Sequence, residues 1–254
     1  MALPPDSVPK TIAVAVSLCL VASMIVSAVA VSLRPVQEVN KLKDKQINIL
    51  QVAGLYDPDV DVVDAFTAFE PQVLKLVDGE FSQEFDARTF DDLAAADDPA
   101  TSRALEDDPA GIGRQSDFVT IYLLRDDNGR LDKVILPIYG YGLWSTLYGF
   151  IALEENGNDI YGLQFYSHAE TPGLGAEVDN PRWKALWRGK KLADDDGTLQ
   201  ITVAKTAPPA GEEFHVDGLA GATLTSRGVD NLVRFWLGEN GYAPFLAKLK
   251  AGGV

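Results

Sequence analysis

Residues 118–140 read FVTIYLLRDDNGRLDKVILPIYG, two runs rich in β-branched and aromatic residues that flank Asn128-Gly129. An Asn-Gly pair accepts the positive φ angles of a tight hairpin, so this stretch predicts two antiparallel strands. The arrangement recurs in residues 144–153 and 160–167, on either side of a turn at 155–158. We therefore expect four strands in one antiparallel sheet, which decides the fold.

Helical patterns flank this sheet. A short helix is expected to begin at Pro181, and residues 226–237 place apolar side chains at helical spacing. Residues 199–204 predict a further strand. Residues 86–110 are acidic and poor in large apolar side chains, which indicates a solvated loop or short helices. An antiparallel sheet with flanking helices predicts an α+β fold.

The amino-terminal part predicts two more helices. One covers residues 36–55 and ends near Gly54, and the other follows the cap-type residues at 57–59. Asp57, Asp59 and Asp61 alternate like the start of a calcium loop, but no glycine or glutamate follows at the spacing that such a loop needs. Helix capping therefore explains these aspartates better.

Thr11 to Leu33 form a run of 23 residues without a charge. As a helix at about 1.5 Å per residue the run is roughly 35 Å long, enough to cross a hydrocarbon core of about 30 Å. We interpret it as a membrane anchor, with residues 1–33 as tail and transmembrane helix and residues 34–254 as a folded domain. The alternative is a signal peptide cleaved after Ala30, which would release a secreted enzyme, although secretory apolar regions run to about 7–15 residues.

The composition narrows the chemistry. Acidic side chains number 37 against 22 basic ones, and the formal charge of −15 argues against nucleic acid as a partner. The one cysteine, Cys19, excludes an internal disulfide, a thiolate zinc site and an Fe–S cluster held by this chain alone. With His168 and His215 as the only histidines, a multi-histidine metal centre is not expected. The chemistry must come from carboxylates, hydroxyls or an attached group.

Residues 217–226, DGLAGATLTS, lie between a strand-like FHV and the predicted 226–237 helix. The small residues at 220–222 allow a ligand or another backbone to approach closely, and Thr225 or Ser226 can cap the helix. A helix start also attracts anions such as phosphate. The residues alone favour a tight turn with an N-cap.

The same stretch resembles the flavinylation motif of FMN-binding domains, in which an aspartate and a Ser or Thr precede Gly-Ala-Thr. The resemblance implies that Thr223 accepts FMN through a phosphoester bond, with Thr225 as a nearby decoy. An unassisted threonine hydroxyl is a poor nucleophile, so attachment implies a separate flavin transferase that reads Asp217. The other cofactor-binding residues implied within the motif are Gly221, Ala222 and Leu224. The sequence departs from the family at Ala220, where a hydroxyl residue is usual.

Two further stretches resemble the same domains. Residues 170–175 (ETPGLG) resemble a loop that lies beside the flavin ring, and residues 140–145 (GYGLWS) resemble a glycine-rich GLW segment. The ring-binding residues implied are Thr171, Gly173, Leu174, Gly175, Leu143, Trp144 and Ser145. Without the resemblance, ETPGLG is a proline-glycine turn and Trp144 is better explained as a core aromatic. His168 and His215 are open both as flavin contacts and as ordinary polar residues, so no catalytic role is assigned to a side chain.

The whole layout, with one amino-terminal membrane helix and the carboxyl-terminal run RFWLGENGYAPFLAKLK, resembles the C-type subunits of Na⁺-translocating NADH:quinone oxidoreductases. The resemblance implies an electron-transfer subunit of a complex in the bacterial inner membrane. No dinucleotide fingerprint is present, so NADH is expected to bind another subunit. The alternatives are the G-type subunit of the complex that couples ferredoxin to NAD, which residues 57–117 match less well, and a non-redox periplasmic interaction module.

The side of the membrane does not follow from charge. Arg34, Lys41, Lys43 and Lys45 outnumber Lys10, which by itself favours a carboxyl-terminal domain in the cytoplasm. Long domains translocate despite local charge, so the count leaves the side open. The resemblance implies that the domain is periplasmic.

Overall fold

A computed structural model describes residues 7–253 of the chain. Contacts divide the chain into two compact units, one up to Asp44 and one from Lys45 onward. The expected boundary at 33/34 marks where the chain would leave a membrane, and it stays a prediction. Residues 1–6 and Val254, the outer ends of the two predicted regions, lie outside the described residues.

A single helix, α1 (Val8–Ala53), spans 46 residues. The helices predicted over 11–33 and 36–55 are therefore one helix that continues through Pro35. A proline removes one backbone donor from a helix but does not by itself prevent helical residues on both sides. The helix ends at Gly54, whose φ of +76° is the left-handed conformation that glycine adopts after a helix terminus. Within residues 7–253, α1 is the one helix long and apolar enough to cross a membrane, which is consistent with an anchor.

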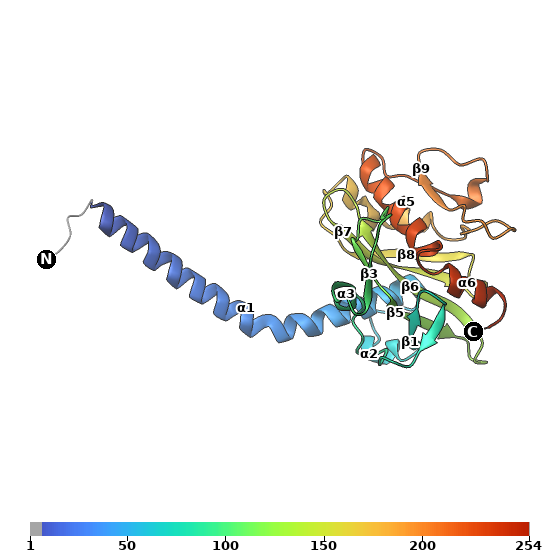
Figure 1. Cartoon of the computed structure of the whole chain (residues 1–254), viewed down its shortest axis with the longest axis horizontal. Coiled ribbons are helices and arrows are strands. Elements are labelled where there is room, and N and C mark those ends of the chain that lie inside the picture. The colour runs from blue at the N-terminus through green and yellow to red at the C-terminus, as the bar shows by residue number, and fades with distance from the viewer. Residues whose placement is uncertain (1–6, 254) are drawn as a thin grey trace. The chain divides into compact units, whose positions relative to one another are not determined.

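A six-stranded antiparallel sheet, in the order β2-β1-β5-β6-β7-β8, organises the larger unit (Figure 1). The four predicted strands are β5 (Phe118–Arg125), β6 (Leu131–Tyr141), β7 (Thr146–Glu154) and β8 (Ile160–Ser167). They are joined in two hairpins whose turns contain Gly129, at φ +78°, and Gly157, at φ +62°. The predicted α+β fold with an antiparallel sheet is confirmed.

The sheet is larger than the sequence predicts. β1 (Phe69–Lys75) and β2 (Glu80–Ser82) precede the expected strands, and β1 pairs along its whole length with β5. The β1 run FEPQVLK contains Pro71 and two charged residues, so it lacks the regular alternation that marks β5 to β8. β1 forms because its backbone pairs with β5, although its own sequence pattern does not predict a strand.

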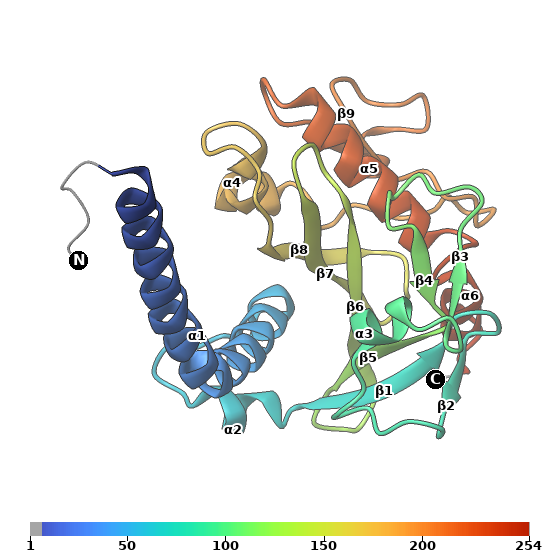
Figure 2. The same ribbon diagram turned by 60° about the vertical axis from the view of Figure 1, so that its left-hand side comes forward.

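Different helices cover the two faces of the sheet. Alternation along β6 sends Val134 and Leu136 to one cluster of buried side chains and Ile135 to another. The first cluster includes the apolar face of α5 (Thr223–Leu237), which lies against β6 and β9 (Figure 2). The second includes the last turns of α1, through Ile49, Leu50, Val52 and Ala53. The sheet is therefore buried between α5 and the end of α1.

The remaining elements are short. They are α2 (Val62–Phe66), α3 (Asp92–Asp97), β3 (Ser102–Ala104), β4 (Arg114–Ser116), η1 (Gly175–Asp179), α4 (Pro181–Ala185), β9 (Thr202–Ala204), η2 (Glu212–Phe214), β10 (His215–Asp217) and α6 (Ala243–Lys250). The helix predicted at Pro181 is confirmed as α4. The strand predicted over 199–204 is confirmed in its last three residues, which form β9. Asp61 caps α2 by accepting the N–H of Val63 at 2.8 Å, so capping is confirmed there. The acidic stretch 86–110 contains the expected short helix, α3, and also β3, which is not predicted.

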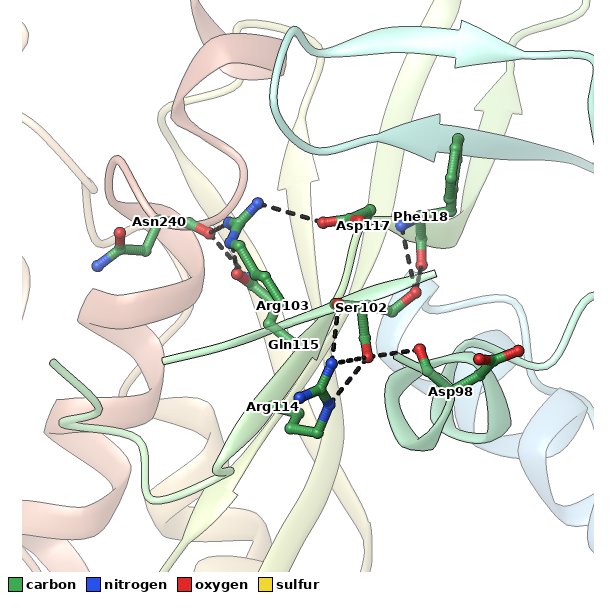
Figure 3. A network of polar contacts seen from close by, with 9 residues as sticks. Asp98, Ser102, Arg103, Arg114, Gln115, Asp117, Phe118 and Asn240 are labelled. Carbon is green, nitrogen blue, oxygen red and sulfur yellow. Dashed lines mark hydrogen bonds and ion pairs between the residues drawn. The ribbon is translucent and has the colours of Figure 1, made fainter. Parts of the chain in front are cut away.

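The hairpin of β3 and β4 is tied to the turn that follows α5 (Figure 3). Arg103 Nη2 donates to the carbonyl oxygen of Asn240 at 3.1 Å and to Gln115 Oε1 at 2.6 Å. The fully buried Gln115 donates to the same carbonyl at 2.8 Å, and Arg103 forms an ion pair with Asp117 at 3.5 Å. These contacts fix the carboxyl-terminal end of α5, the helix whose other end carries the candidate site.

Candidate functional site

One carboxylate joins the three motifs. Glu170 follows β8, and its Oε1 accepts the backbone N–H groups of Leu143, Trp144 and Ser145 at 3.0, 2.9 and 3.2 Å. Its Oε2 accepts the hydroxyl of Thr225 in α5 at 2.7 Å. Residues 140–145, 170–175 and 217–226 therefore meet at the amino-terminal end of α5.

Glu170 is held in its ionised form. The residue is only 5% exposed, and burial alone would raise the pKa of its carboxyl group. The hydrogen bonds from Trp144, Thr225, Leu143 and Ser145 outweigh that effect and hold the pKa below its ordinary value of 4.5. The carboxylate is charged at neutral pH, and both of its oxygen atoms accept hydrogen bonds, one from the 143–145 backbone and one from Thr225.

Protonation of Glu170 at low pH is expected to lower the free energy of unfolding of the domain. Its pKa in the folded chain lies below the ordinary 4.5, so its contribution to the free energy of unfolding is fully present above that pH and is lost as the pH falls through the lower, folded-state value. Urea unfolding of the full chain and of Glu170→Gln should give a constant difference in unfolding free energy near neutral pH and a shrinking difference below pH 4.5. A difference that persists unchanged into strong acid would contradict this expectation.

The helix of the flavin motif begins earlier than predicted. α5 starts at Thr223, and its N-cap is Ala222, whose side chain makes no capping bond. The prediction that Thr225 or Ser226 caps this helix is wrong, because Thr225 donates to Glu170 and Ser226 Oγ accepts the N–H of Leu219 at 2.8 Å. The first N–H groups of a helix have no acceptor within it, so Thr223 lies at a positive helix end without a side-chain cap.

The two threonines of the motif differ in access. Thr225 is fully buried, and its hydroxyl is bonded to Glu170. Thr223 is exposed. Of the two hydroxyls, that of Thr223 is the one open to an incoming reagent.

The turn before α5 packs closely on the 170–175 loop. Gly221 has a φ of +77°, and a Cβ built on it would lie 3.3 Å from Leu174 Cδ2. The carbonyl oxygen of Asp217 accepts Trp183 Nε1 at 2.7 Å, while the residue itself is exposed. The backbone of the turn is thus fixed, with Asp217 and Thr223 accessible from outside.

Large apolar side chains of the three joined motifs are not buried. Trp144 is 66% exposed, Leu224 51% and Leu174 44%. The interpretation of Trp144 as a core aromatic is therefore wrong. Exposed apolar groups on segments that are joined to one another mark a ligand or protein contact. Trp144 and Leu174 lie on the two loops that meet at Glu170, and Leu224 lies in the first turn of α5, which Glu170 joins to them.

The other residues implied as ring contacts shape the loops. Ser145 Oγ accepts the N–H of Ala169 at 2.7 Å, and the carbonyl oxygen of Thr171 accepts the N–H of Leu174 at 3.1 Å. Gly173 has a φ of +73°, and the buried Gly175 begins η1. The proline-glycine turn is confirmed, and it lies at the site.

The two histidines have structural partners. His168 Nδ1 accepts the N–H of Glu170 at 3.2 Å, and its Nε2 lies 2.8 Å from Asp179 Oδ2, so it braces the loop that carries Glu170. The buried His215 has its Nε2 3.0 Å from the carbonyl oxygen of Ala204, which links β10 to β9. Both have well-defined roles in the fold.

This arrangement fits a flavin nucleotide. The start of α5 offers N–H groups and the positive helix end to a phosphate, with the Thr223 hydroxyl beside them. The exposed Trp144, Leu174 and Leu224 offer apolar surface to a flat ring. Together they present one polar and one apolar part, as an FMN molecule requires.

Comparisons with known proteins agree with this site. The family described as FMN-binding domain matches residues 142–238, a span that begins within the 140–145 segment and ends just after α5. The larger unit thus contains an FMN-binding domain. The C-type subunit of the Na⁺-translocating NADH-quinone reductase of Yersinia pestis is 49% identical over 98% of this chain and 96% of its own length, and that of Pseudomonas aeruginosa is 49% identical over 97% and 98%.

Solved structures show the same likeness. The crystal structure of Shewanella oneidensis NqrC covers 84% of this chain and 99% of its own, with a TM-score of 0.77 and 35% identity. The corresponding structure from Parabacteroides distasonis covers 84% and 96%, with a TM-score of 0.65 and 29% identity. The chain belongs to the NqrC family, the C-type subunits of Na⁺-translocating NADH-quinone reductases. This assignment favours the predicted family over the G-type subunit and over a non-redox interaction module.

Glu170 is the site residue that the sequence pattern does not single out. The signal was available in the motif, since Glu170 is the first residue of ETPGLG. Nothing in the spacing tells that its carboxylate bonds to residues about 26 positions earlier and 55 later, contacts that exist only in the folded chain. Tertiary packing decides this role.

Proposed function

We propose that this chain is the covalent-FMN electron-transfer subunit of a Na⁺-translocating NADH-quinone reductase, with the flavin attached as a phosphoester on Thr223. The observation that carries the proposal is the contrast between an exposed Thr223 at an uncapped helix start and a Thr225 that is buried and bonded. Family membership supports the same cofactor and the same complex.

The chain's residues divide the work of holding the flavin. The N–H groups at the start of α5 bind the phosphate, and the positive helix end favours its negative charge. Trp144, Leu174 and Leu224, whose side chains are exposed, would hold the flavin ring and shield it from water. Bound FMN supplies one-electron oxidation and reduction, while the protein fixes its position and surroundings.

Attachment requires partners outside this chain. The carboxylate at the motif, Glu170, is bonded to the Thr225 hydroxyl and not to that of Thr223. A separate flavin transferase therefore supplies the activation, and Asp217 is exposed where that enzyme can read it. We place the domain in the periplasm, anchored by α1 in the inner membrane, with NADH and quinone bound by other subunits. A covalent bond prevents loss of the cofactor from such a compartment.

The intact mass of the chain, purified from its native membrane, tests the proposal. The expected mass exceeds that of the sequence by roughly one FMN less one water, because a phosphoester forms with loss of water. The same spectrum reports whether the amino-terminal segment has been cleaved after Ala30. An unmodified mass from cells that contain the transferase would contradict the proposal.

A further inference from the structure

Three backbone N–H groups of the loop that carries Trp144 converge on a single oxygen atom. The N–H groups of Leu143, Trp144 and Ser145 all point to Oε1 of Glu170, between 2.9 and 3.2 Å away. Successive N–H groups that converge in this way form a concave anion site, or nest. Here the anion is part of the chain itself, so the loop is ordered around Glu170.

This internal anion leaves one anion site open for a ligand. The nest of residues 143–145 is filled by Glu170, whereas the start of α5 has no side-chain cap. A phosphate group can therefore accept N–H bonds at the start of α5. At the nest it would be repelled by the negative charge of Glu170. Because Glu170 occupies the nest of residues 143–145, the phosphate is expected at the start of α5 and the ring on the side of Trp144.

Two glycines make room for this carboxylate. A Cβ on Gly142 would lie 2.7 Å from Glu170 Oε1, and a Cβ on Gly175 would lie 2.6 Å from Oε2 and 2.6 Å from Thr225 Oγ1. These distances are shorter than any ordinary contact of a side chain. Gly142 and Gly175 therefore let Glu170 approach both the loop and α5.

The backbone of Glu170 is also fixed. Its N–H donates to His168 Nδ1 at 3.2 Å, and His168 is in turn bonded to Asp179. The preceding residue, Ala169, donates to Ser145 Oγ at 2.7 Å. The carboxylate is thus aimed from a strand end that is braced by His168 and is itself bonded to the loop through Ser145.

We propose that Glu170 is the positioning residue of the flavin site, which holds the 143–145 loop against the first turn of α5 before any flavin is attached. The inference rests on the proposed function, since it names what orders the ring side of that site. It assigns Glu170 no contact with the reacting atoms. Its consequence is that the loop is already in place in the unmodified chain.

Amide hydrogen exchange of the unmodified chain tests this directly. The full-length Thr223→Ala chain, in detergent, serves as the parent, because it carries no acceptor hydroxyl. Adding Glu170→Ala should speed exchange of the peptide that contains residues 143–145 by at least about tenfold, since each of these amides loses a bond to a charged acceptor. Adding Glu170→Gln, which retains an acceptor oxygen, should produce a smaller increase.

Glu177→Gln is the matched control. Glu177 lies in η1, a few residues along the same segment, and accepts Asn180 Nδ2 at 2.6 Å without touching the 143–145 loop. Its exchange at 143–145 should equal that of the parent. Unchanged exchange in Glu170→Ala, or an increase spread evenly over the whole domain in both Glu170 variants, overturns the inference.

A second readout uses the chain with its native threonine and the transferase present. Visible circular dichroism reports the asymmetric surroundings of the flavin ring, and Glu170→Ala should lose most of that signal while Glu177→Gln keeps it. If the native chain carries no flavin after denaturation, the proposed function fails. If it is loaded and Glu170→Ala retains the full signal, the positioning role alone fails.

Discussion

Thr223→Ala is expected to abolish all flavin that survives denaturation of the chain. The substitution removes the hydroxyl oxygen to which the phosphate would be esterified, and no change in packing is needed for the loss, because Thr223 is exposed at the first position of α5. The fold should remain, since Thr223 contributes nothing to the buried clusters. Flavin fluorescence of the denatured chain in a gel, together with intact mass, measures the result.

Thr225→Ala is the matched control, two residues further along the same helix. It deletes a hydroxyl that is fully buried and that donates to Glu170 at 2.7 Å. Losing one hydrogen bond to a charged group costs about 1.5–3 kcal/mol of stability, which loosens the site without removing the acceptor. Some covalent flavin should therefore persist. Yellow colour on the denatured Thr223→Ala chain, or its complete loss from Thr225→Ala alone, would contradict the assignment.

The sequence predicts the central strands because their local signals are strong. The two hairpins of β5 to β8 combine β-branched and aromatic runs with turn glycines at positive φ, and the structure has both. β1 and the β3–β4 hairpin lack such signals and form because a neighbour completes them: β5 pairs with β1, and Asn240 accepts bonds from the hairpin. Partners distant in sequence decide these elements.

The candidate site also has features that the sequence predicts and features that only tertiary contacts determine. The three motifs are visible as short stretches, and the resemblance assigns each of them to a flavin. The helix start is missed by three residues because Ala222, which has no capping group, ends up as the N-cap while the hydroxyls of Thr225 and Ser226 turn inward. Cap rules rank side chains by local bonding, and here tertiary bonds to Glu170 and Leu219 take those hydroxyls.

Gly228→Ala should both destabilise the domain and displace the 143–145 loop. Within α5 the change is favourable by itself, because alanine is better than glycine in a helix interior by about 1 kcal/mol. The tertiary contact opposes it. A Cβ on Gly228 would lie 2.5 Å from the carbonyl oxygen of Tyr141 and 2.8 Å from Gly142 Cα. Both are backbone atoms, so no rotamer change relieves the overlap.

The tertiary effect should win, since overpacking of a close contact costs about 1–3 kcal/mol and the atoms it meets belong to the strand end that leads into the 143–145 loop. Urea unfolding of the full chain should show a lower free energy of unfolding, and the loaded chain should lose visible circular dichroism of the flavin. Arg227→Ala, at the exposed neighbouring position of α5, should change the free energy of unfolding by no more than about 0.5 kcal/mol. It should leave the visible circular dichroism of the flavin unchanged. If Gly228→Ala proves more stable than the parent with an undisturbed flavin signal, helix propensity outweighs the contact, and α5 does not need its close approach to Tyr141 and Gly142 to build the site.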